Sequence, residues 1–151
     1  RLKRHERYIW LLFGCLCLAV WTVIGITATK PEPKDPAWRF VQDYNTVSIS
    51  PMETVTKYQD ETLIGETYGI PVTLTTDKQI LTIAVPPEAS GEHAKQLILD
   101  TAHTLNMQVS DQELLDFVKY LGSDLGISDS TTEIRLTKTQ GVTIRKFIQE
   151  S

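Results

Sequence analysis

The run from residue 9 to residue 28 contains no charged side chain and consists mostly of large apolar residues. An α-helix rises about 1.5 Å per residue, so roughly 20 apolar residues cross the hydrocarbon core of a bilayer. The run therefore predicts one transmembrane helix. The residues expected to form this membrane anchor are Ile9, Trp10, Leu11, Leu12, Phe13, Leu16, Leu18, Val20, Trp21, Val23 and Ile24.

Three other interpretations of this run fit less well. A buried helix of a soluble core is normally shorter and has a polar stripe. A cleaved signal peptide has an apolar region of about 7–15 residues, whereas this run stays apolar through Ile24. The sequence that ends at Cys15 resembles a lipoprotein signal, but Phe13 is bulky for that motif and apolar residues continue after the cysteine. We therefore favour an uncleaved span.

The charges that flank the run predict its orientation. Residues 1–8 form a short flank with four basic side chains and one acidic side chain, and an excess of Lys and Arg marks the cytoplasmic side. The opposite flank holds Lys30, Lys34 and Arg39, so the bias is modest. We expect a single-pass protein of the cell (inner) membrane with a cytoplasmic N-terminus. Its C-terminal domain is expected on the extracytoplasmic or periplasmic side.

The sequence after residue 7 is acidic, with 18 Asp and Glu against 11 Lys and Arg, a formal charge of about −7. Nucleic-acid binding needs a clustered basic surface that releases counterions, so we expect no nucleic-acid partner. Cys15 and Cys17 are the only cysteines, and both lie in the apolar run. The rest of the sequence therefore has neither a disulfide framework nor a thiolate metal site.

Residues 29–36 contain three prolines and predict a semi-extended spacer between the membrane and the domain. Residues 37–79 are harder to assign, and for residues 53–69 the sequence predicts no particular structure. Residues 47–50 alternate apolar and polar side chains as a strand does. The residues with the spacing of one face of a short helix are Trp38, Phe40, Val41 and Tyr44.

The pattern becomes regular near the domain core expected at residues 80–151. Two β-branched runs, 72–75 and 80–85, predict a hairpin with its loop at residues 76–79. A helix is then expected after an N-cap at Ser90. Its expected buried face is Ala94, Leu97, Ile98, Ala102 and Leu105.

A second helix and a second hairpin follow. Ser110 and Glu113 have the spacing of a capping box, which predicts a helix start. Residues 133–138 and 142–148 have strand periodicity and flank a turn in which Gly141 supplies a positive φ. The expected buried face of the helix is Leu114, Phe117, Val118, Leu121 and Leu125, with Gly122 or Gly126 as its terminator.

These patterns predict an α+β fold, with two amphipathic helices packed on an antiparallel or mixed sheet. After residue 80 the predicted order is strand, helix, helix, strand, strand. That order resembles the arrangement of polypeptide-transport-associated domains and related ring-building modules of envelope machines, which often follow a single membrane anchor. The last predicted strand is the candidate edge for a partner, through Val142, Ile144, Phe147 and Ile148.

No residue pattern predicts a catalytic, cofactor-binding or metal-binding site. His93 and His103 are ten residues apart on one predicted helix, or about 15 Å, too far to share an ion. Asp100 and His103 are one turn apart, a spacing typical of a solvated pair. The serines lie at predicted caps and turns, and the sequence contains no nucleophile elbow and no phosphate-binding glycine loop.

We therefore expect a non-enzymatic subunit of a cell-envelope assembly, of the secretion, conjugation, pilus or division type. Its expected partners are the lipid bilayer and other membrane or envelope proteins, in a hetero- or homo-oligomer. A membrane-anchored extracytoplasmic sensor or regulatory binding protein, or an accessory subunit of a membrane enzyme complex, remains the alternative. No cofactor is expected for any of these roles.

Overall fold

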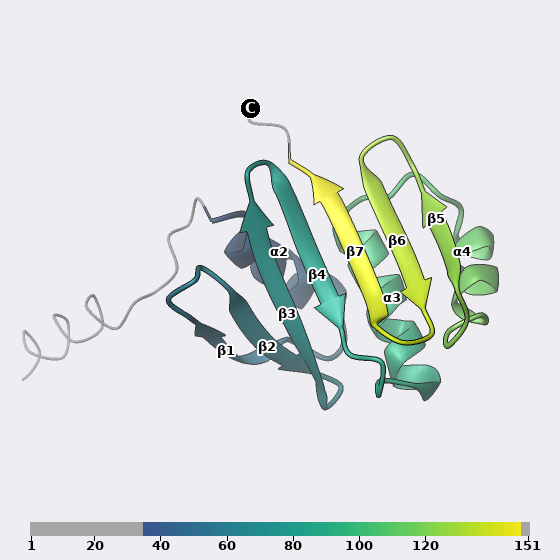
Figure 1. Ribbon diagram of the computed structural model, residues 1–151, viewed down its shortest axis with the longest axis horizontal. Helices are drawn as coiled ribbons and strands as arrows, with labels where there is room; N and C mark the ends of the chain where they lie inside the picture. Colours follow the sequence, from purple (N-terminus) through teal and green to yellow (C-terminus); the bar gives the residue numbers. More distant parts are fainter. Residues whose placement is uncertain (1–34, 149–151) are drawn as a thin grey trace, which may run out of the picture. The chain divides into compact units, whose positions relative to one another are not determined.

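The computed structural model describes residues 35–148, and this part of the chain is an α+β unit. It contains three helices and one antiparallel sheet of seven strands (Figure 1). The helices are α2 (Pro36–Val47), α3 (Gly91–Thr104) and α4 (Asp111–Val118). The strands are β1 (Glu53–Lys57), β2 (Leu63–Thr67), β3 (Ile70–Asp77), β4 (Ile80–Val85), β5 (Leu125–Ser128), β6 (Thr132–Thr137) and β7 (Gly141–Phe147).

The strand order across the sheet is β1-β2-β3-β4-β7-β6-β5. Strands β1 to β4 form a meander in which each strand pairs with the next. The chain then crosses behind the sheet through α3 and α4 and begins again at the opposite edge with β5 (Figure 1). Strand β6 follows beside β5, and β7 closes the sheet by pairing with both β6 and β4.

All three helices cover the same face of the sheet (Figure 1). Side chains alternate along each strand, so one set faces the helices and forms the core. Fully burying one large aliphatic side chain contributes about 1.5–3 kcal/mol, which makes this layer the main source of stability. Its most buried members are Tyr44, Leu63, Leu74, Ile83, Leu97, Ile98, Leu114, Ile134, Leu136, Ile144, Val41 and Val72.

The short helix expected after the spacer is confirmed as α2, which buries Phe40, Val41 and Tyr44. Asp35 caps it by accepting a hydrogen bond of 3.0 Å from the Ala37 amide. Pro36, assigned to the spacer from the sequence, is the first helical residue, where its missing N–H costs nothing.

The strand expected at residues 47–50 is absent from the structure. Val47 is the last residue of α2, and the amide of Ser48 donates to the Tyr44 carbonyl over 2.8 Å. The helix therefore continues through the first residue of the alternating run. A four-residue alternation is too short to decide between a strand and a helix end.

Residues 53–69, which had no assignment from the sequence, contain the hairpin of β1 and β2. The inner positions of β2 are Leu63, Gly65 and Thr67, so its buried face lacks the apolar alternation of an ordinary strand. Gly65 leaves room for the Met52 side chain, because a Cβ at position 65 would lie 2.6 Å from Cγ of Met52. Local periodicity could not identify this strand.

The helix predicted after Ser90 is confirmed as α3, with Ala94, Leu97 and Ile98 among its buried residues. Ser90 occupies the N-cap position, but its side chain makes no capping hydrogen bond. Leu105, expected on the buried face, is the C-cap residue.

The helix predicted at the capping box is confirmed as α4, but it is shorter than expected. Ser110 Oγ accepts a hydrogen bond of 3.2 Å from the Glu113 amide. The helix ends at Val118, before Leu121 and Leu125, and Leu125 begins strand β5. Neither glycine terminates the helix directly.

Strand β5 also corrects the element order predicted after residue 80. Three strands follow the two helices, where the sequence predicted two. The resemblance to polypeptide-transport-associated domains rested on that shorter order, so it no longer describes the chain. The antiparallel α+β architecture and the final hairpin, with Gly141 at φ +84°, are confirmed.

The predicted membrane anchor at residues 9–28 and most of the predicted spacer lie outside the described residues. Within residues 35–148, none of the helices has the length and hydropathy of a membrane span.

Candidate functional site

The strand predicted as a partner edge, β7, lies inside the sheet and pairs with β4 on one side and β6 on the other. Val142 and Ile144 face the helices and are buried, whereas Phe147 is exposed on the opposite face and Ile148 is partly buried. The last strand is internal because the chain crosses to the far edge before β5. This prediction was therefore wrong, and the true edges of the described sheet are β1 and β5.

Edge strand β1 is poorly suited to pair with another chain. Its register against β2 shifts between Glu53 and Thr56, and Thr54 has a left-handed φ of 51°. It also carries charged residues, Glu53 and Lys57, at its two ends. Bulges and charges of this kind are the features that protect sheet edges from association.

Edge strand β5 lacks these protective features. It pairs with β6 in a regular register, from Leu125 opposite Leu136 to Ser128 opposite Glu133. All four of its residues are uncharged, and Leu125, Gly126 and Ser128 are exposed whereas Ile127 is partly buried. Alternate residues of an edge strand direct their N–H and C=O groups away from the sheet. Its shortness, and the acidic residues Asp124 and Asp129 that flank it, are the defences that β5 has.

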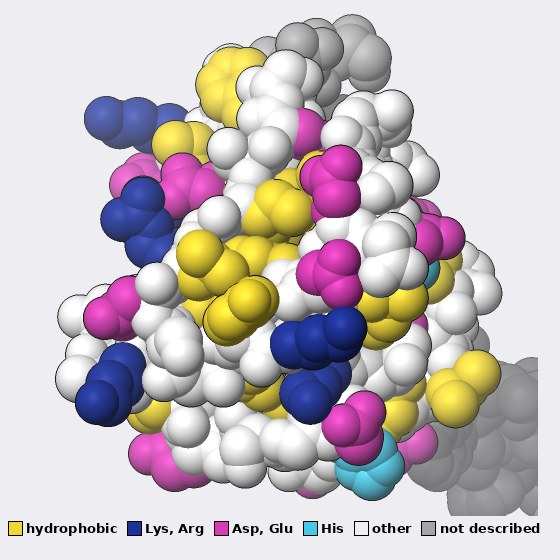
Figure 2. Space-filling view, turned by 90° about the vertical axis from the view of Figure 1, so that its right-hand side faces the viewer, with side chains coloured by type: hydrophobic (Ala, Val, Ile, Leu, Met, Phe, Trp, Pro, Cys, Tyr) yellow, Lys and Arg dark blue, Asp and Glu magenta, His cyan; other side chains and the backbone are white. Residues whose placement is uncertain are grey.

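Exposed apolar side chains lie next to this edge. Leu125 on β5 is 41% exposed, and Tyr120, in the turn after α4, is 57% exposed. Leu121 and Ile127 are partly buried beside them. Figure 2, which looks onto this end of the unit, shows apolar side chains gathered in the middle, with both acidic and basic side chains beside them. We call β5 together with Tyr120 and Leu121 the β5 edge.

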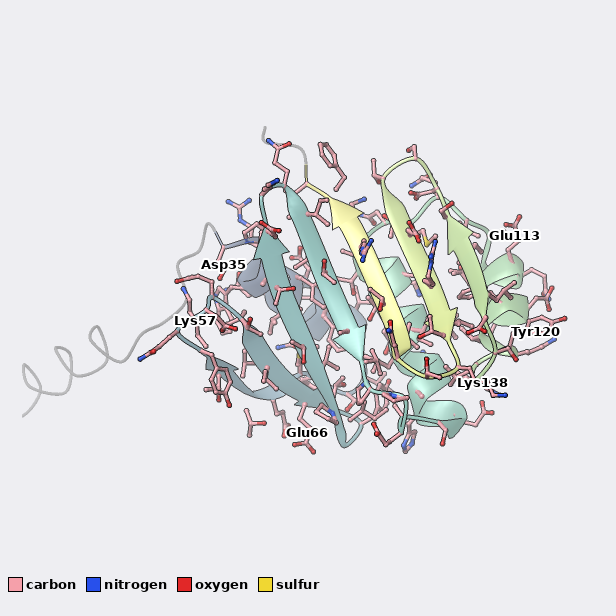
Figure 3. The ribbon with its side chains drawn as sticks, in the orientation of Figure 1. Asp35, Lys57, Glu66, Glu113, Tyr120 and Lys138 are labelled. Carbon is pink, nitrogen blue, oxygen red and sulfur yellow. The ribbon has the colours of Figure 1, made fainter. Side chains whose placement is uncertain are left out.

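Acidic side chains accompany the β5 edge. Figure 3 shows Glu113 and Tyr120 at the same end of the sheet as β5. Asp124 directly precedes β5 and accepts a hydrogen bond of 2.9 Å from the Lys138 amide. On the exposed side of α4, Lys119 donates to Asp116 over 3.1 Å and, together with Gln112, lowers the pKa of that carboxyl.

A hydrogen-bonded turn fixes the far end of β5. Asp129 Oδ1 accepts from the amides of Thr131 and Thr132 at 2.8 and 2.7 Å, and its Oδ2 accepts from the Gln108 amide at 2.6 Å. Burial alone would raise the pKa of Asp129, but these amides and the charge of Lys146 lower it below its ordinary value. The carboxylate thereby ties the β5–β6 turn to the loop between α3 and α4.

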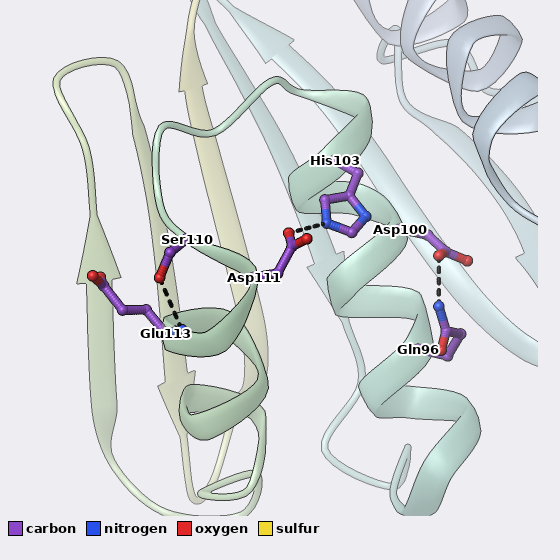
Figure 4. A network of polar contacts seen from close by, with 6 residues as sticks. All are labelled: Gln96, Asp100, His103, Ser110, Asp111 and Glu113. Atoms are coloured by element: carbon purple, nitrogen blue, oxygen red, sulfur yellow. Dashed lines mark hydrogen bonds and ion pairs between the residues drawn. The ribbon is translucent and has the colours of Figure 1, made fainter.

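A second candidate site is centred on Asp100 of α3, which is only 5% exposed. Its Oδ2 accepts hydrogen bonds from Ser48 Oγ at 2.7 Å and from the Tyr68 hydroxyl at 3.0 Å. Its Oδ1 accepts from Gln96 Nε2 at 2.8 Å, as Figure 4 shows. One buried carboxylate thus joins α3, the segment after α2 and the turn between β2 and β3.

The network continues toward the core through hydroxyl groups. Thr67 Oγ1 donates to the Ser50 carbonyl over 2.8 Å and lies 3.1 Å from the Tyr44 hydroxyl. Burial raises the pKa of Tyr44, and the nearby Asp100 adds to this effect. Burial is also the main reason that the pKa of Tyr68 is raised, with Asp100 acting in the same direction.

The geometry of this network is that of a structural connector. Tyr68 has a left-handed φ of 54° and stacks on His93, with ring centroids 5.3 Å apart. Ser48 bonds to Asp100, to the Ser50 carbonyl and, at 3.4 Å, to Tyr68. The Ser48 and Tyr68 hydroxyls thus hold the residue after α2 and the turn between β2 and β3 against α3.

The pair considered from the sequence, Asp100 with His103, does not form. His103 Nε2 instead lies 3.0 Å from Asp111 Oδ1, linking α3 to the start of α4 (Figure 4). Asp100 points to the other side of α3, toward Gln96. Among residues 35–148, no group of three or more His, Cys, Asp or Glu side chains is arranged to hold a metal ion.

Sequence reasoning missed both candidate sites, although each left a signal. Asp100 is three residues after Leu97, which places it at the margin of the apolar face of the predicted helix. It is four residues after Gln96, whose side-chain amide therefore lies one turn away. Leu125 and Ile127 alternate with Gly126 and Ser128, which is a short strand pattern.

The fold and these sites define an antiparallel α+β domain with one helical layer, a buried carboxylate connector and an open edge at β5. Comparison of the chain with protein-family models, curated proteins and solved structures finds no match.

Proposed function

We propose that this chain is a non-enzymatic, single-pass membrane subunit of a multiprotein cell-envelope assembly, of the secretion, conjugation, pilus or division type. In this proposal the domain at residues 35–148 is a structural or scaffold component that binds a neighbouring subunit outside the cytoplasm. The anchor predicted at residues 9–28 holds the domain at the membrane. The observation that carries the proposal is the open, uncharged edge at β5.

The β5 edge supports binding by β-augmentation, in which a partner adds one strand to an exposed sheet edge. The added strand would lie about 4.8 Å from β5 and bond to its outward main-chain groups. Its inward side chains would cover Leu125 and Tyr120, which are exposed in the isolated unit. In such a contact, main-chain hydrogen bonds provide affinity, and the buried apolar side chains fix the register of the added strand.

The test is site-specific photo-crosslinking in the native membrane. A photoreactive phenylalanine analogue replaces Tyr120 at the β5 edge, and the matched control places it at Tyr58, which is 51% exposed just beyond β1. We expect position 120 to crosslink to another envelope protein and position 58 to give little or no product. Mass spectrometry of the crosslinked band identifies the partner.

Absence of a crosslink at position 120, with the protein purifying as a monomer, would refute the proposal. A crosslink to a subunit of a membrane enzyme complex would instead assign the chain as an accessory subunit of that complex.

A further inference from the structure

We propose that the helix-free face of β6 and β7 carries a site for a carboxylate group of an acidic peptide segment, held between Arg135 and Arg145. This site lies on the face of the sheet, inward of the β5 edge, and goes beyond the strand addition proposed above. The proposal rests on a polar hollow between the two arginines and on the unpaired charge of Arg145.

The hollow has a volume of about 290 Å³ and lies over the β6–β7 hairpin, on the face opposite the helices (Figure 1). Arg135 on β6 is opposite Thr143, and Arg145 is two residues further along β7 on the same face. Residues in such a diagonal relationship are about 7–8 Å apart, so both guanidinium groups can approach one small anion. The residues that line the hollow are Glu133, Arg135, Thr137, Gln140, Thr143 and Arg145.

The two arginines differ in what they contact. Arg135 Nη2 forms an ion pair with Glu133 Oε1 over 3.0 Å. Glu133 is directly opposite Arg145 in the strand register, yet no hydrogen bond or ion pair within residues 35–148 engages the exposed Arg145 side chain. A guanidinium group stays charged and has five N–H donors. Arg145 therefore offers all of its donors to a ligand, and Arg135 offers those that Glu133 leaves unused.

The charge of the hollow favours an anion with a single negative charge. Two arginines and Glu133 give the lining a formal charge of +1. One carboxylate balances this charge, and its two oxygens match the parallel N–H groups of a guanidinium. A phosphate group carries about −1.5 to −2 at pH 7, so Glu133 would repel it more strongly. A carboxylate is therefore preferred over a phosphate.

The acidic character of the domain is weak at this place, although residues 35–148 have a formal charge of −7. Strand β4 places the uncharged Thr82 opposite Arg145, and the next acidic residue beyond it on this face is Asp77 at the end of β3. Two strand spacings separate β3 from β7, about 10 Å, and exposed charges at that distance are largely screened at physiological salt. Asp129, in the turn before β6, already accepts hydrogen bonds from three backbone amides.

The test is an NMR titration of nitrogen-15-labelled full-length protein in mild detergent. One capped peptide of about seven residues alternates threonine with glutamate, and its twin alternates threonine with glutamine. We expect the glutamate peptide to shift the Nε–H signals of Arg135 and Arg145, with weaker binding at high salt because the charges are screened. The glutamine peptide should shift neither signal.

Three variants make the test specific to the hollow. Arg145→Gln should weaken the glutamate peptide about threefold to fivefold, the effect of one well-placed surface ion pair. Lys119→Gln removes the same charge from α4, behind the sheet, and should change the affinity less than about twofold. Glu133→Gln removes the competing carboxylate and should strengthen binding about twofold to threefold.

Equal shifts by the two peptides, or equal effects of Arg145→Gln and Lys119→Gln, would overturn the proposal. Tighter binding of inorganic phosphate than of the glutamate peptide would also overturn it. The crosslink at position 120 probes a different surface, so this proposal and the proposed function fail separately.

Discussion

Ser48 and Asp100, 52 positions apart in the sequence, are joined by a hydrogen bond of 2.7 Å between Oγ and Oδ2. The bond links the end of α2 to the middle of α3. Because Asp100 also accepts from Tyr68, the same carboxylate holds the turn between β2 and β3. One buried carboxylate thus connects the end of α2, the turn between β2 and β3, and α3.

Replacing Asp100 with alanine should destabilise the domain by about 3 kcal/mol. The variant would leave Ser48, Tyr68 and Gln96 without their acceptor, and losing a hydrogen-bonded partner in a buried site costs about this much. Denaturant unfolding of the two proteins measures the difference. Asp43→Ala, on the exposed side of α2, serves as the control and should stay within about 0.5 kcal/mol of the parent.

The domain should lose stability above about pH 10 because of Tyr44 and Tyr68. Both pKa values are raised from the ordinary 10.0 in the folded state, chiefly by burial. A group with a raised folded pKa contributes stability that is complete below its unfolded pKa and is lost as the pH rises through the folded value. Denaturant midpoints measured from pH 8 to 11 should therefore fall, and the fall should be shallower in Tyr68→Phe. An identical slope in the two proteins would contradict this assignment.

Low pH should destabilise the domain through Asp129, in the turn between β5 and β6. The pKa of Asp129 in the folded domain is lowered from the ordinary 3.8. The ionised carboxylate therefore stabilises the domain above about pH 3.8, and this stability is lost as the pH falls through the lower folded pKa. The denaturant midpoint should drop below about pH 4, and this drop should be smaller in Asp129→Asn. Asp116→Asn provides the comparison, because Asp116 lies on the exposed side of α4 and the loss of its surface ion pair with Lys119 should have little effect on stability.

Gly141→Ala should destabilise the domain more than Gly122→Ala. Both glycines have positive φ angles, +84° and +96°, so each substitution incurs a backbone cost of about 1 kcal/mol. A Cβ at position 141 would in addition overlap the Val85 carbonyl oxygen, whereas the space around position 122 is open. Overpacking adds about 1–3 kcal/mol, so thermal unfolding should separate the two variants clearly. Similar melting temperatures would show that the β4–β7 contact can relax.

The sequence predicted the parts of the fold that depend on neighbours along the chain. Helices α2 and α3 and the hairpin of β6 and β7 were recognised because their buried residues recur at helical or strand spacing. Strand β2 was missed because Gly65 and Thr67 occupy its inner positions, where packing against Met52 matters more than hydrophobicity.

The position of β7 was predicted wrongly for a different reason. Which strand becomes an edge depends on where the chain re-enters the sheet. After α3 and α4 it begins again at the far edge with β5, so β7 fills the place between β4 and β6. Strand β5 was missed because Leu125 was assigned to the preceding helix. Asp100 was missed because its partners Ser48 and Tyr68 come from distant segments of the chain. Local patterns cannot specify such contacts.

The central place of β7 has a consequence for biosynthesis. Strands β4 and β6 do not pair with each other, because β7 lies between them, and β7 is the last strand of the described chain to leave the ribosome. Until then each half of the sheet presents an unpaired interior edge and an incomplete apolar layer, the condition in which nascent chains misassociate. The sheet should therefore be completed in one late folding step. Until then a chaperone or an already assembled partner should cover the unpaired strand edges of the nascent chain.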